Sequence, residues 1–415
     1  MSKNLSENEI KKMHDNYVVP TYAPKIAIVK GKGAWVWSAS GKKYLDFCSG
    51  IAVTNIGHSH PRLVAAIKEQ AEQLIHISNL FYNPLQPQLA EALVNCSGLD
   101  GAKCFFCNSG AEANEGLIKL ARLWGSGSGK YEIITFKNSF HGRTLATLTA
   151  TGQDKVKKGF GPLPEGFLHA EYNNIDSVKN LIGTNTVAVI IEAIQGEGGI
   201  VKSHPEFLVE LQQLCKASGI LLLCDEVQAG VGRTGKWFGF QHFDIKPDAI
   251  SLAKGLGGGF PIGCLITGKK VANIFQPGHH ATTFGGTPLG SAAALAVIET
   301  ISDEDLLKNA EEMGEKFMDG LKEIAIKYSQ WIEGVRGIGL MNGLVLKVPA
   351  VRLQEEVFNN GLLSIATAQK VLRLLPPMII QSDEVDVALN VIKKSCADLN
   401  DEMILLSKSY TEKEG

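Results

Sequence analysis

Short apolar runs alternate with helical patterns through the middle of the chain. The runs are nearly continuous in apolar residues and lie at 104–107, 132–136, 187–194, 220–227 and 263–268. Such runs are typical of strands that are buried on both faces of a parallel sheet. Between two of them, apolar residues recur at helical spacing from Phe207 to Leu214, and Gly219 follows as a helix stop. The pattern predicts an α/β fold with a mostly parallel sheet covered by helices.

The pattern changes towards both ends of the chain. Residues 303–328 form a long charged segment with helical periodicity, short strands follow it, and a final helix is predicted near 384–404. Near the N-terminus, WVWSASGKKYLDF at 35–47 predicts a β-hairpin with a Ser-Gly turn. We therefore expect a large domain over 53–304 and a smaller α+β domain built from both ends, residues 1–52 and 305–415.

Composition narrows the classes of function. Of the 415 residues, 45% are hydrophobic and 20% are charged, and the formal net charge is −2. A balance this close to neutral gives no electrostatic footprint for nucleic acid. No run approaches the roughly 18 apolar residues of a membrane span, and the polar start of the chain lacks the apolar core of a secretory signal. We expect a cytoplasmic protein that binds neither nucleic acid nor membrane.

The eight cysteines are scattered without a disulfide rhythm, so we expect reduced thiols. Cys104 and Cys107 form a C-x-x-C pair within a predicted strand, where positions three apart point to opposite faces. No second cysteine pair and no paired histidines complete a zinc site. We therefore interpret the pair as two small core residues and expect no metal centre.

One lysine stands in an unusual setting. Lys254 lies in the stretch SLAKGLGGGFPIG, directly before a cluster of glycines, and apolar residues flank the stretch on both sides. Glycine permits positive φ and lets another group approach the backbone closely. The stretch predicts a lysine held at a crowded place, beside a group that is not a protein side chain. A nucleotide-binding loop is the alternative, but the order G-x-x-x-x-G-K-[ST] is not met.

Polar groups also follow two other predicted strands. Ser109, Gly110 and Ala111 precede a helix whose free N–H groups could hold a phosphate, although Ser before Gly is also an ordinary N-cap. Asp225 ends an apolar strand, at the sheet edge where ligands bind in α/β proteins. A carboxylate in that place is costly without a positive partner, and a helix cap or local salt bridge is the alternative interpretation.

A third strand is followed by NSFHGRT, which contains Phe140, His141 and Arg143. An aromatic ring can stack on a planar ligand, and arginine can bind a carboxylate through two hydrogen bonds. His141 by itself is typical of a structural histidine. A phosphate cradle, a stacking ring, a carboxylate and a lysine together suit pyridoxal phosphate, which needs a lysine for its Schiff base and an acid beside its pyridine nitrogen.

The order of motifs along the chain resembles that of the class III, fold-type I pyridoxal-phosphate aminotransferases and, within them, the acetylornithine aminotransferases. The similarity covers nearly the whole chain and rests on YLDFCSGIAVTNIGHSHP, FFCNSGAEANE, FHGRTLATLTATGQ, IQGEGG, CDEVQAGVGRTG, AKGLGGGFPIG and TTFGGTPL. Motifs this long and in this order are far more specific than a lone short motif.

The resemblance implies an enzyme that moves the terminal amine of N-acetylornithine, or of a similar ω-amino acid, to 2-oxoglutarate in arginine biosynthesis. It also implies a homodimer whose active sites are shared between subunits. 4-Aminobutyrate, free ornithine and succinyl-diaminopimelate stay open as alternative donors. An aminomutase or a decarboxylase on the same scaffold, and a cofactor-binding regulator without catalysis, are the alternatives from other classes.

Carried over position by position, the resemblance implies a set of cofactor contacts. Lys254 would form the Schiff base and act as the catalytic base. Asp225 would pair with the pyridine nitrogen, and Gln228 would contact the phenolic oxygen. Gly110 and Ala111 would hold the phosphate.

The same resemblance implies further contacts with the ring and with the substrate. Phe140 would stack on the cofactor ring, and Arg143 would bind a substrate carboxylate. Thr283 would reach the phosphate of the neighbouring subunit, and Thr282 would lie beside it near the substrate.

Glu197 and Arg373 resemble the family's paired substrate switch. The reacting end of the donor carries no carboxylate, whereas the reacting carbon of 2-oxoglutarate does. A glutamate that neutralises Arg373 in one half-reaction and swings away in the other would serve both substrates. A static ion pair is the alternative, because Arg373 lies in an apolar strand where an unpaired cation is expensive.

Several positions depart from the family pattern. Ala193 stands where proline is common, Thr287 stands where asparagine is common, and ATAQKVLRLLPP lacks the customary glycine pair before Arg373. Ile51 stands where the ornithine aminotransferases have a tyrosine that meets the free α-amine. Because isoleucine offers no hydrogen bond to an ammonium, we expect Ile51 to disfavour free ornithine.

Overall fold

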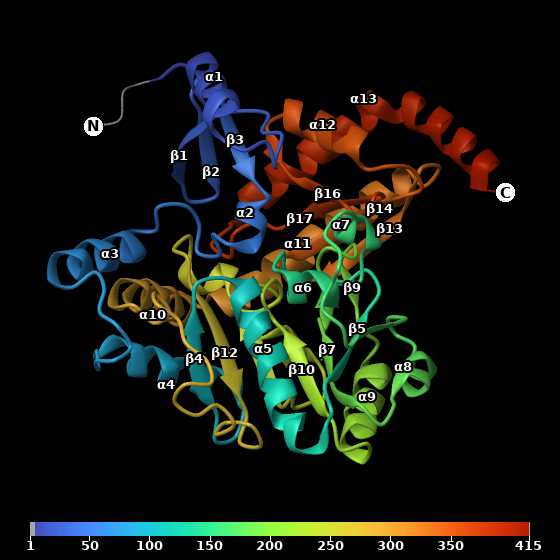
Figure 1. Ribbon diagram of the computed structural model, residues 1–415. Coiled ribbons are helices and arrows are strands. Elements are labelled where there is room, and N and C mark those ends of the chain that lie inside the picture. Colours follow the sequence, from blue (N-terminus) through green and yellow to red (C-terminus); the bar gives the residue numbers. More distant parts are fainter. Residues whose placement is uncertain (1–4, 415) are drawn as a thin grey trace.

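A seven-stranded sheet forms the lower part of the molecule in Figure 1, a computed structural model that describes residues 5–414, with side chains to residue 410. The strand order is β4-β12-β11-β10-β7-β5-β6, and within it β12 alone runs antiparallel to its neighbours. The strands are β4 (Lys103–Cys107), β5 (Glu132–Phe136), β6 (Phe167–Ala170), β7 (Thr186–Ile191), β10 (Leu221–Asp225), β11 (Ala249–Leu252) and β12 (Gly263–Thr267). The predicted mostly parallel sheet is confirmed.

Helices cover both faces of this sheet, as its continuous apolar strands predict. Leu221 and Leu223 of β10 share a buried cluster with Leu117, whereas Leu222 shares the opposite cluster with Leu208. The surrounding helices are α3 (Pro61–Gln73), α4 (Leu85–Ser97), α5 (Gly110–Gly125), α6 (Leu145–Ala150), α8 (Ile175–Leu181), α9 (Pro205–Ala217) and α10 (Pro288–Asp303). Gly219, with φ +60°, follows α9 as predicted.

Two four-stranded sheets form the upper part of the molecule. One has the order β1-β2-β3-β15, and its parallel pairing of β3 with β15 joins the N-terminal segment to the C-terminal one. The other has the order β13-β14-β17-β16. Their strands are β1 (Ile28–Lys32), β2 (Trp35–Ser38), β3 (Lys43–Asp46), β13 (Ile332–Ile338), β14 (Met341–Leu346), β15 (Leu362–Leu363), β16 (Ile365–Thr367) and β17 (Val371–Leu374). The predicted hairpin is β2–β3, and Gly41 in its turn has φ +84°.

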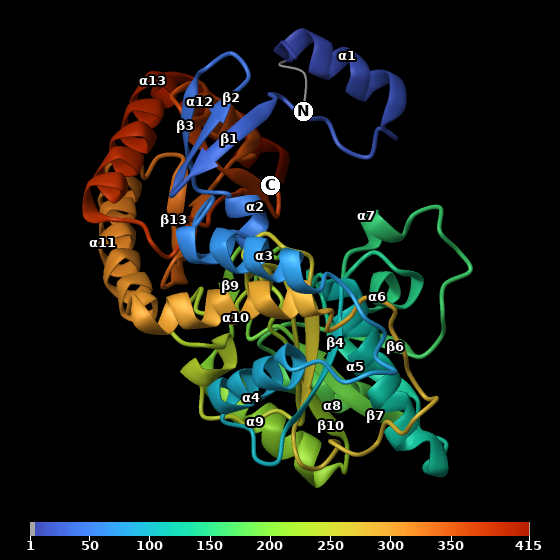
Figure 2. The same cartoon turned by 90° about the vertical axis from the view of Figure 1, so that its left-hand side faces the viewer.

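Helices α11 (Leu306–Lys327), α12 (Val351–Asn359) and α13 (Ser382–Glu414) pack on these sheets, and α1 (Glu7–Tyr17) lies at the N-terminal end (Figure 2). Helix α13 runs beyond the predicted end near residue 404. Ile404 and Tyr410 still pack against the core, and neither glycine nor proline interrupts the described residues after 404. The domain boundaries at 53 and 305 stay a prediction.

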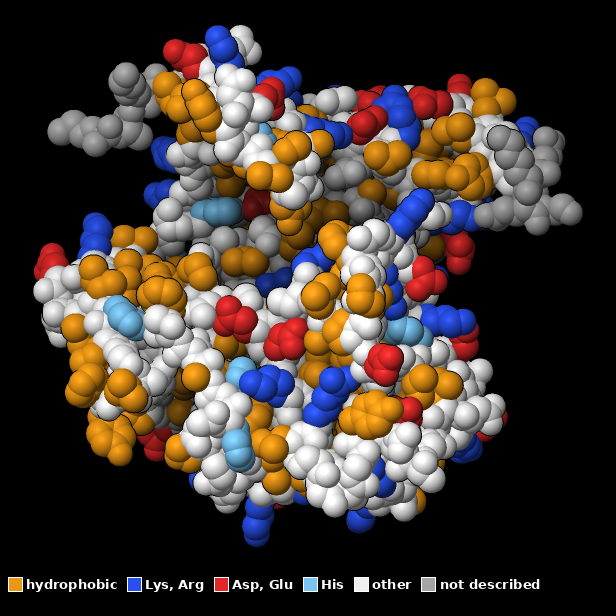
Figure 3. All heavy atoms as spheres, viewed as in Figure 1, with side chains coloured by type: hydrophobic (Ala, Val, Ile, Leu, Met, Phe, Trp, Pro, Cys, Tyr) orange, Lys and Arg blue, Asp and Glu red, His pale blue; other side chains and the backbone are white. Residues whose placement is uncertain are grey.

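Short elements complete the described part of the chain. They are α2 (Ser49–Ala52), α7 (Asp154–Lys157), β8 (Ile194–Gln195), β9 (Val201–Lys202) and three short 3-10 turns, at Ser126–Ser128, Gly239–His242 and Lys254–Gly257. The space-filling view in Figure 3 shows a hollow between the upper and lower parts on this face.

Across the described residues, every helix is too short or too polar to cross a membrane. The same residues contain no group of three or more histidines, cysteines or acids placed to hold a metal ion. All eight cysteines are free thiols, and of the C-x-x-C pair Cys107 is buried and Cys104 is half-buried.

Candidate active site

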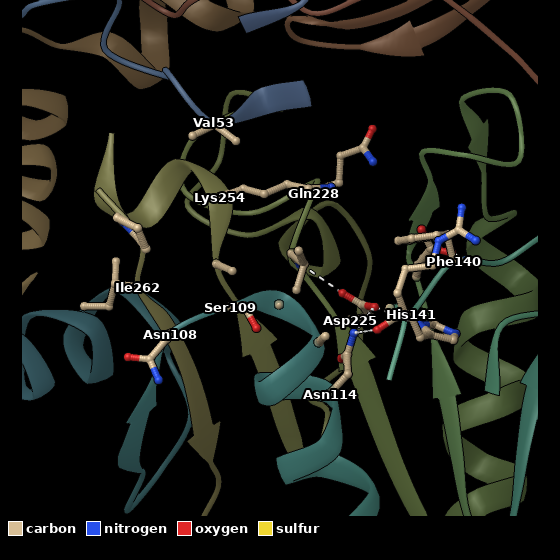
Figure 4. A pocket seen from close by; sticks show the side chains of 18 of the residues that line it. Val53, Asn108, Ser109, Asn114, Phe140, His141, Asp225, Gln228, Lys254 and Ile262 are labelled. Carbon is tan, nitrogen blue, oxygen red and sulfur yellow. Dashed lines mark hydrogen bonds and ion pairs between the residues drawn. The ribbon is translucent and has the colours of Figure 1, made fainter. Parts of the chain in front are cut away.

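The carboxyl ends of five strands open on one cavity of about 440 Å³ (Figure 4). The chain segments that follow β4, β5, β7, β10 and β11 all contribute lining residues, as expected for the ligand-binding edge of a parallel sheet. The sequence-predicted residues that line the cavity are Gly110, Ala111, Phe140, Arg143, Asp225, Gln228 and Lys254.

Asp225 ends β10 inside a closed hydrogen-bond network and is only 4% exposed. Its Oδ2 accepts hydrogen bonds from Asn114 Nδ2 and His141 Nδ1, each at 2.7 Å. Its Oδ1 accepts from the backbone N–H of Val227 at 3.0 Å and from Ser251 Oγ at 3.4 Å. These donors hold the carboxylate in one orientation and satisfy the hydrogen-bonding needs of its buried oxygens.

His141 is buried directly beside this carboxylate. Burial lowers its pKa, but the hydrogen bond and the charge of Asp225 outweigh burial, so the pKa stands above the ordinary histidine value. Because an ionised carboxylate can only accept, Nδ1 of His141 carries the proton in this contact. Nε2 is buried and has no hydrogen-bond partner among the described residues. His141 is therefore hydrogen-bonded, as expected of a structural histidine, and its partner is the cavity-lining Asp225.

Lys254 follows β11 and projects into the cavity, and Figure 4 shows its side chain extending towards Gln228. Its ammonium makes no hydrogen bond or ion pair within the described residues. Burial and the nearby Arg373 lower its pKa, against the opposing charges of Glu197 and Asp225. Lys254 also adopts a left-handed φ of +48°, a conformation that costs a non-glycine residue of order 1–3 kcal/mol and is concentrated at functional sites.

The glycines after Lys254 lie in a crowded place, and protein atoms account for most of the crowding. A Cβ at Gly255 would lie 2.2 Å from Asn55 Nδ2, and one at Gly258 would lie 2.8 Å from Val297. At most positions of the cluster, protein atoms would therefore clash with a larger side chain. Gly259 is the exception, because it lines the cavity and an added Cβ would meet nothing within 4 Å.

The N-terminus of α5 supplies donors at the opposite wall. Ser109 is its N-cap, and its hydroxyl accepts the N–H of Glu112 at 3.2 Å. The first-turn N–H groups of Gly110 and Ala111 have no acceptor within the helix. A Cβ at Gly110 would lie 2.7 Å from Val227 Cγ1, so glycine is needed for α5 to begin this close to the loop after β10. The arrangement is one that favours an anion.

Phe140 and Arg143 lie on the loop that follows β5. Phe140 is half-buried at the cavity wall, whereas Arg143 is exposed. The Arg143 guanidinium lies 5.4 Å from the centre of the Phe140 ring, within cation–π distance.

Gln228 connects the cavity to an ion pair. Arg373 Nη1 donates to Gln228 Oε1 at 3.0 Å and to Glu197 Oε1 at 2.6 Å. The Arg373 side chain is 1% exposed and that of Glu197 is 28% exposed. Burial raises the pKa of Glu197. The charge and hydrogen bond of Arg373 outweigh burial, so the pKa lies below the ordinary value. The structure therefore brings Glu197 and Arg373 together, as paired charges behind the cavity wall.

Thr282 and Thr283 do not line the cavity of their own chain. Thr282 Oγ1 accepts the N–H of Gly285 at 3.1 Å and the side chain of Asn108 at 3.4 Å. Thr283 is exposed.

Sequence reasoning missed Asn114 and Glu192, which also line the cavity. Asn114 lies on the buried face of α5, one turn before Leu117, and a polar residue on an apolar helix face could have indicated it. Glu192 follows the apolar run of β7 in the same way that Asp225 ends β10, so the argument that found Asp225 applied to Glu192 as well.

The departures from the family pattern have local explanations. Ala193 is buried, and its carbonyl accepts a hydrogen bond from Tyr172. Thr287 Oγ1 donates to the carbonyl of Ile75 at 2.8 Å. In the turn between β16 and β17, Ala368 and Gln369 have φ of +45° and +62°, so non-glycine residues occupy left-handed positions that favour glycine.

Ile51 lies in α2 with φ +66° and is half-buried. Val53 from the same segment lines the cavity, and Ile51 does not.

Comparison with known proteins places this site in a family. The family model for class-III aminotransferases matches residues 17–396. The acetylornithine aminotransferase of Aquifex aeolicus is 47% identical over 91% of this chain and 99% of its own length. That of Gloeobacter violaceus is 46% identical over 92% of this chain and 96% of its own length.

Solved structures agree with this assignment. The ornithine aminotransferase of Toxoplasma gondii superposes with a TM-score of 0.91 at 31% identity, covering 97% of both chains. The acetylornithine aminotransferase of Elizabethkingia anophelis superposes with a TM-score of 0.84 at 30% identity, covering 95% of this chain and all of its own. The fold is that of the fold-type I enzymes, and the chain belongs to the class-III aminotransferase family.

Proposed function

We propose that this protein is an aminotransferase that moves the terminal amine of N-acetylornithine to 2-oxoglutarate, with pyridoxal phosphate as its cofactor. One observation carries the proposal. The same cavity contains the Lys254 amine, which has no hydrogen-bond partner among the described residues, and the buried Asp225 carboxylate. When it is bound, pyridoxal phosphate supplies an electron-withdrawing ring that stabilises negative charge on the carbon that carried the amine.

The residues present fit this cofactor. The free N–H groups of Gly110 and Ala111 would hold its phosphate, and Phe140 would stack on its ring. Asp225 would accept a hydrogen bond from the protonated pyridine nitrogen, because Asn114 and His141 hold its carboxylate in one orientation. Gln228 would contact the phenolic oxygen.

The lysine moves the proton. Because burial and Arg373 lower its pKa, Lys254 Nζ has a larger neutral fraction near pH 7 than an ordinary lysine. Nζ would take the proton from the amine-bearing carbon of the donor and, with pyridoxal phosphate bound, would carry that proton to the cofactor in the same half-reaction. The left-handed backbone of Lys254 fixes the direction from which the side chain enters the cavity.

The charged side chains near the cavity suit a donor and an acceptor that differ in charge at the reacting end. Arg143 is exposed at the mouth of the cavity, where it can bind a substrate carboxylate through two hydrogen bonds. We propose that Glu197 masks Arg373 while the donor reacts and releases it for 2-oxoglutarate. The contact at 2.6 Å corresponds to the masked state.

The same proposal includes a homodimer in which Thr282 and Thr283 serve the neighbouring subunit. Large apolar side chains are exposed next to this segment, because Phe284 is 62% and Leu80 is 86% exposed. Asn79 Nδ2 donates to the carbonyl of Gly285 at 2.9 Å and ties the two exposed segments together. Sedimentation of the active enzyme should give a dimer; a fully active monomer at high dilution would contradict this part.

The cytoplasm is the location that we propose.

A panel of amino donors, each with 2-oxoglutarate as acceptor, tests the function. We expect the highest kcat/KM for N-acetylornithine, above ornithine, 4-aminobutyrate and succinyl-diaminopimelate. The relatives named acetylornithine aminotransferase support the first donor, whereas the structural similarity to ornithine aminotransferases makes ornithine the second candidate. Turnover without an acceptor, or release of CO₂, would contradict a transaminase.

A further inference from the structure

Glu192 is a buried acid that the proposed reaction does not use. It follows β7 at the cavity wall and is 6% exposed. Its Oε2 accepts the backbone N–H of Phe140 at 3.1 Å, and its Oε1 accepts the backbone N–H of Gly196 at 3.4 Å. One carboxylate therefore connects the loop that carries the stacking ring to the loop that carries Glu197.

This position is costly for an acid. Burial raises the pKa of Glu192 to about 7, so the folded state favours its protonated form. A folded-state pKa above the unfolded one means that stability falls as pH rises through the interval between the two values. A buried acid that opposes the stability of its own fold, at the wall of a cavity, is a candidate for a functional role.

Glu226 offers a matched comparison within the same chain. It is buried, it accepts the backbone N–H groups of Gly239 and Phe240 at 2.7 and 2.8 Å, and burial raises its pKa to about 8. Its own segment lines the cavity through Asp225 and Val227, but the two residues that it holds, Gly239 and Phe240, do not, whereas Phe140, which Glu192 holds, does. Glu192 differs from Glu226 in what it connects rather than in how it is buried.

We propose that Glu192 is a positioning residue that locks the backbone of Phe140 to that of Gly196. The stacking ring and the Glu197 switch then keep one relative geometry while the Glu197 side chain moves. This inference rests on the roles proposed above for Phe140 and Glu197. The close approach of Gly196 to Gln228, where an added Cβ would lie 2.3 Å from the amide, leaves little room for the backbone to shift.

The lock depends on the charge state of Glu192. The ionised carboxylate can accept both N–H groups, whereas protonation turns one oxygen into a donor. The charged and polar groups that face it are His141, Asp225, Lys254 and Tyr172. Asp225 raises the pKa of Glu192 and His141 lowers it. The lock is therefore expected to weaken as pH falls through 7.

The test is Glu192→Gln in the holoenzyme, with Glu226→Gln as the control. Glutamine offers a single acceptor oxygen and presents its amide nitrogen to the other N–H group. We expect both half-reactions to slow about tenfold at pH 8 in Glu192→Gln. The wild-type rates should decline on the acid side near pH 7, and this decline should be absent in Glu192→Gln and present in Glu226→Gln.

Two further readouts do not depend on activity. The visible circular dichroism of the bound cofactor reports the orientation of its ring, and reconstitution of the apoprotein gives the cofactor dissociation constant. We expect both to change in Glu192→Gln and to stay at wild-type values in Glu226→Gln. Wild-type rates, pH profile and dichroism in Glu192→Gln would overturn the proposal.

If Glu192→Gln does not fold, Glu192→Asp and the wild-type protein decide the question. The shorter aspartate keeps the charge but cannot span both N–H groups, so the dichroism should change. In the wild type, the dichroism should titrate near pH 7, and a flat titration would overturn the proposal. Because the dichroism requires no amino donor, a wrong donor assignment would leave this test intact.

Discussion

Asp225 and Glu197 are two carboxylates near one cavity, but their surroundings differ. Asp225 ends a central strand, is 4% exposed, and is held by side-chain and backbone donors from several elements. Glu197 lies in a glycine-containing loop between β8 and β9, with a side chain that is 28% exposed. Its strong contact is with Arg373, and Thr367 adds a weaker one at 3.5 Å.

The difference indicates two uses of a charge. A carboxylate that is surrounded by fixed donors can stabilise a positive group without moving. A carboxylate that is partly solvated and has one dominant partner can leave it, because water replaces part of the lost interaction. Asp225 is therefore suited to hold a cofactor, and Glu197 is suited to move between substrates.

The largest expected effect comes from Lys254→Ala, which leaves both carboxylates in place. Transamination should fall by roughly 10⁴-fold, because Nζ is the proposed proton carrier. Single-turnover absorbance measures the loss, and Lys158→Ala, at an exposed lysine, is the control. Substantial activity in Lys254→Ala would show that another group moves the proton.

Borohydride reduction of the wild type should label Lys254, and labelling of another lysine would contradict the assignment.

Asp225→Asn should lower kcat by roughly 10²–10³-fold, because it removes a preorganised charge while keeping the shape of the side chain. The substitution also removes the charge that raises the pKa of His141. Steady-state kinetics and cofactor reconstitution measure both effects. A loss smaller than about tenfold would mean that the fixed carboxylate is not the main electrostatic partner of the cofactor.

Glu197→Ala should produce an asymmetric loss. Without Glu197, Arg373 would stay buried and lack its carboxylate partner. Its unpaired positive charge would repel a donor whose reacting end is an amine. We expect the half-reaction with N-acetylornithine to slow about tenfold or more relative to the half-reaction with glutamate. Equal losses with the two donors would favour a static ion pair. Glu206→Ala, at an exposed acid at the start of α9, is the control.

Ile51→Tyr should give the smallest change, a shift of donor preference. A phenolic hydroxyl would offer the free α-amine of ornithine a hydrogen bond that isoleucine lacks. The ratio of kcat/KM for ornithine to that for N-acetylornithine should rise about two- to tenfold. An unchanged ratio would assign donor selection to other residues, with Val53 of the same segment as the next candidate because it lines the cavity.

Local pattern was enough to predict much of the fold. Five strands of the large sheet, α9 with its glycine stop, and the hairpin of β2 and β3 lie where the sequence indicates them, whereas β6 and β11 were not predicted. These features depend on which face of an element is buried and on turn chemistry, and both are encoded within a few neighbouring residues. The length of α13 was underestimated, because its core-facing side continues past the predicted end near residue 404 as far as Tyr410.

The sequence by itself determined the residue types of the candidate site and their order, because strand ends and glycine motifs are local features. Tertiary structure decided which of these residues meet. Glu197 and Arg373 are 176 residues apart in the chain and share an ion pair, and Asn114 contacts Asp225 across 111 residues. It also placed Asn55 against Gly255 and Val297 against Gly258, where neither neighbour leaves room for a larger side chain. Such contacts arise when separate elements pack around a common core, and no local periodicity records which distant side chain will occupy the facing position.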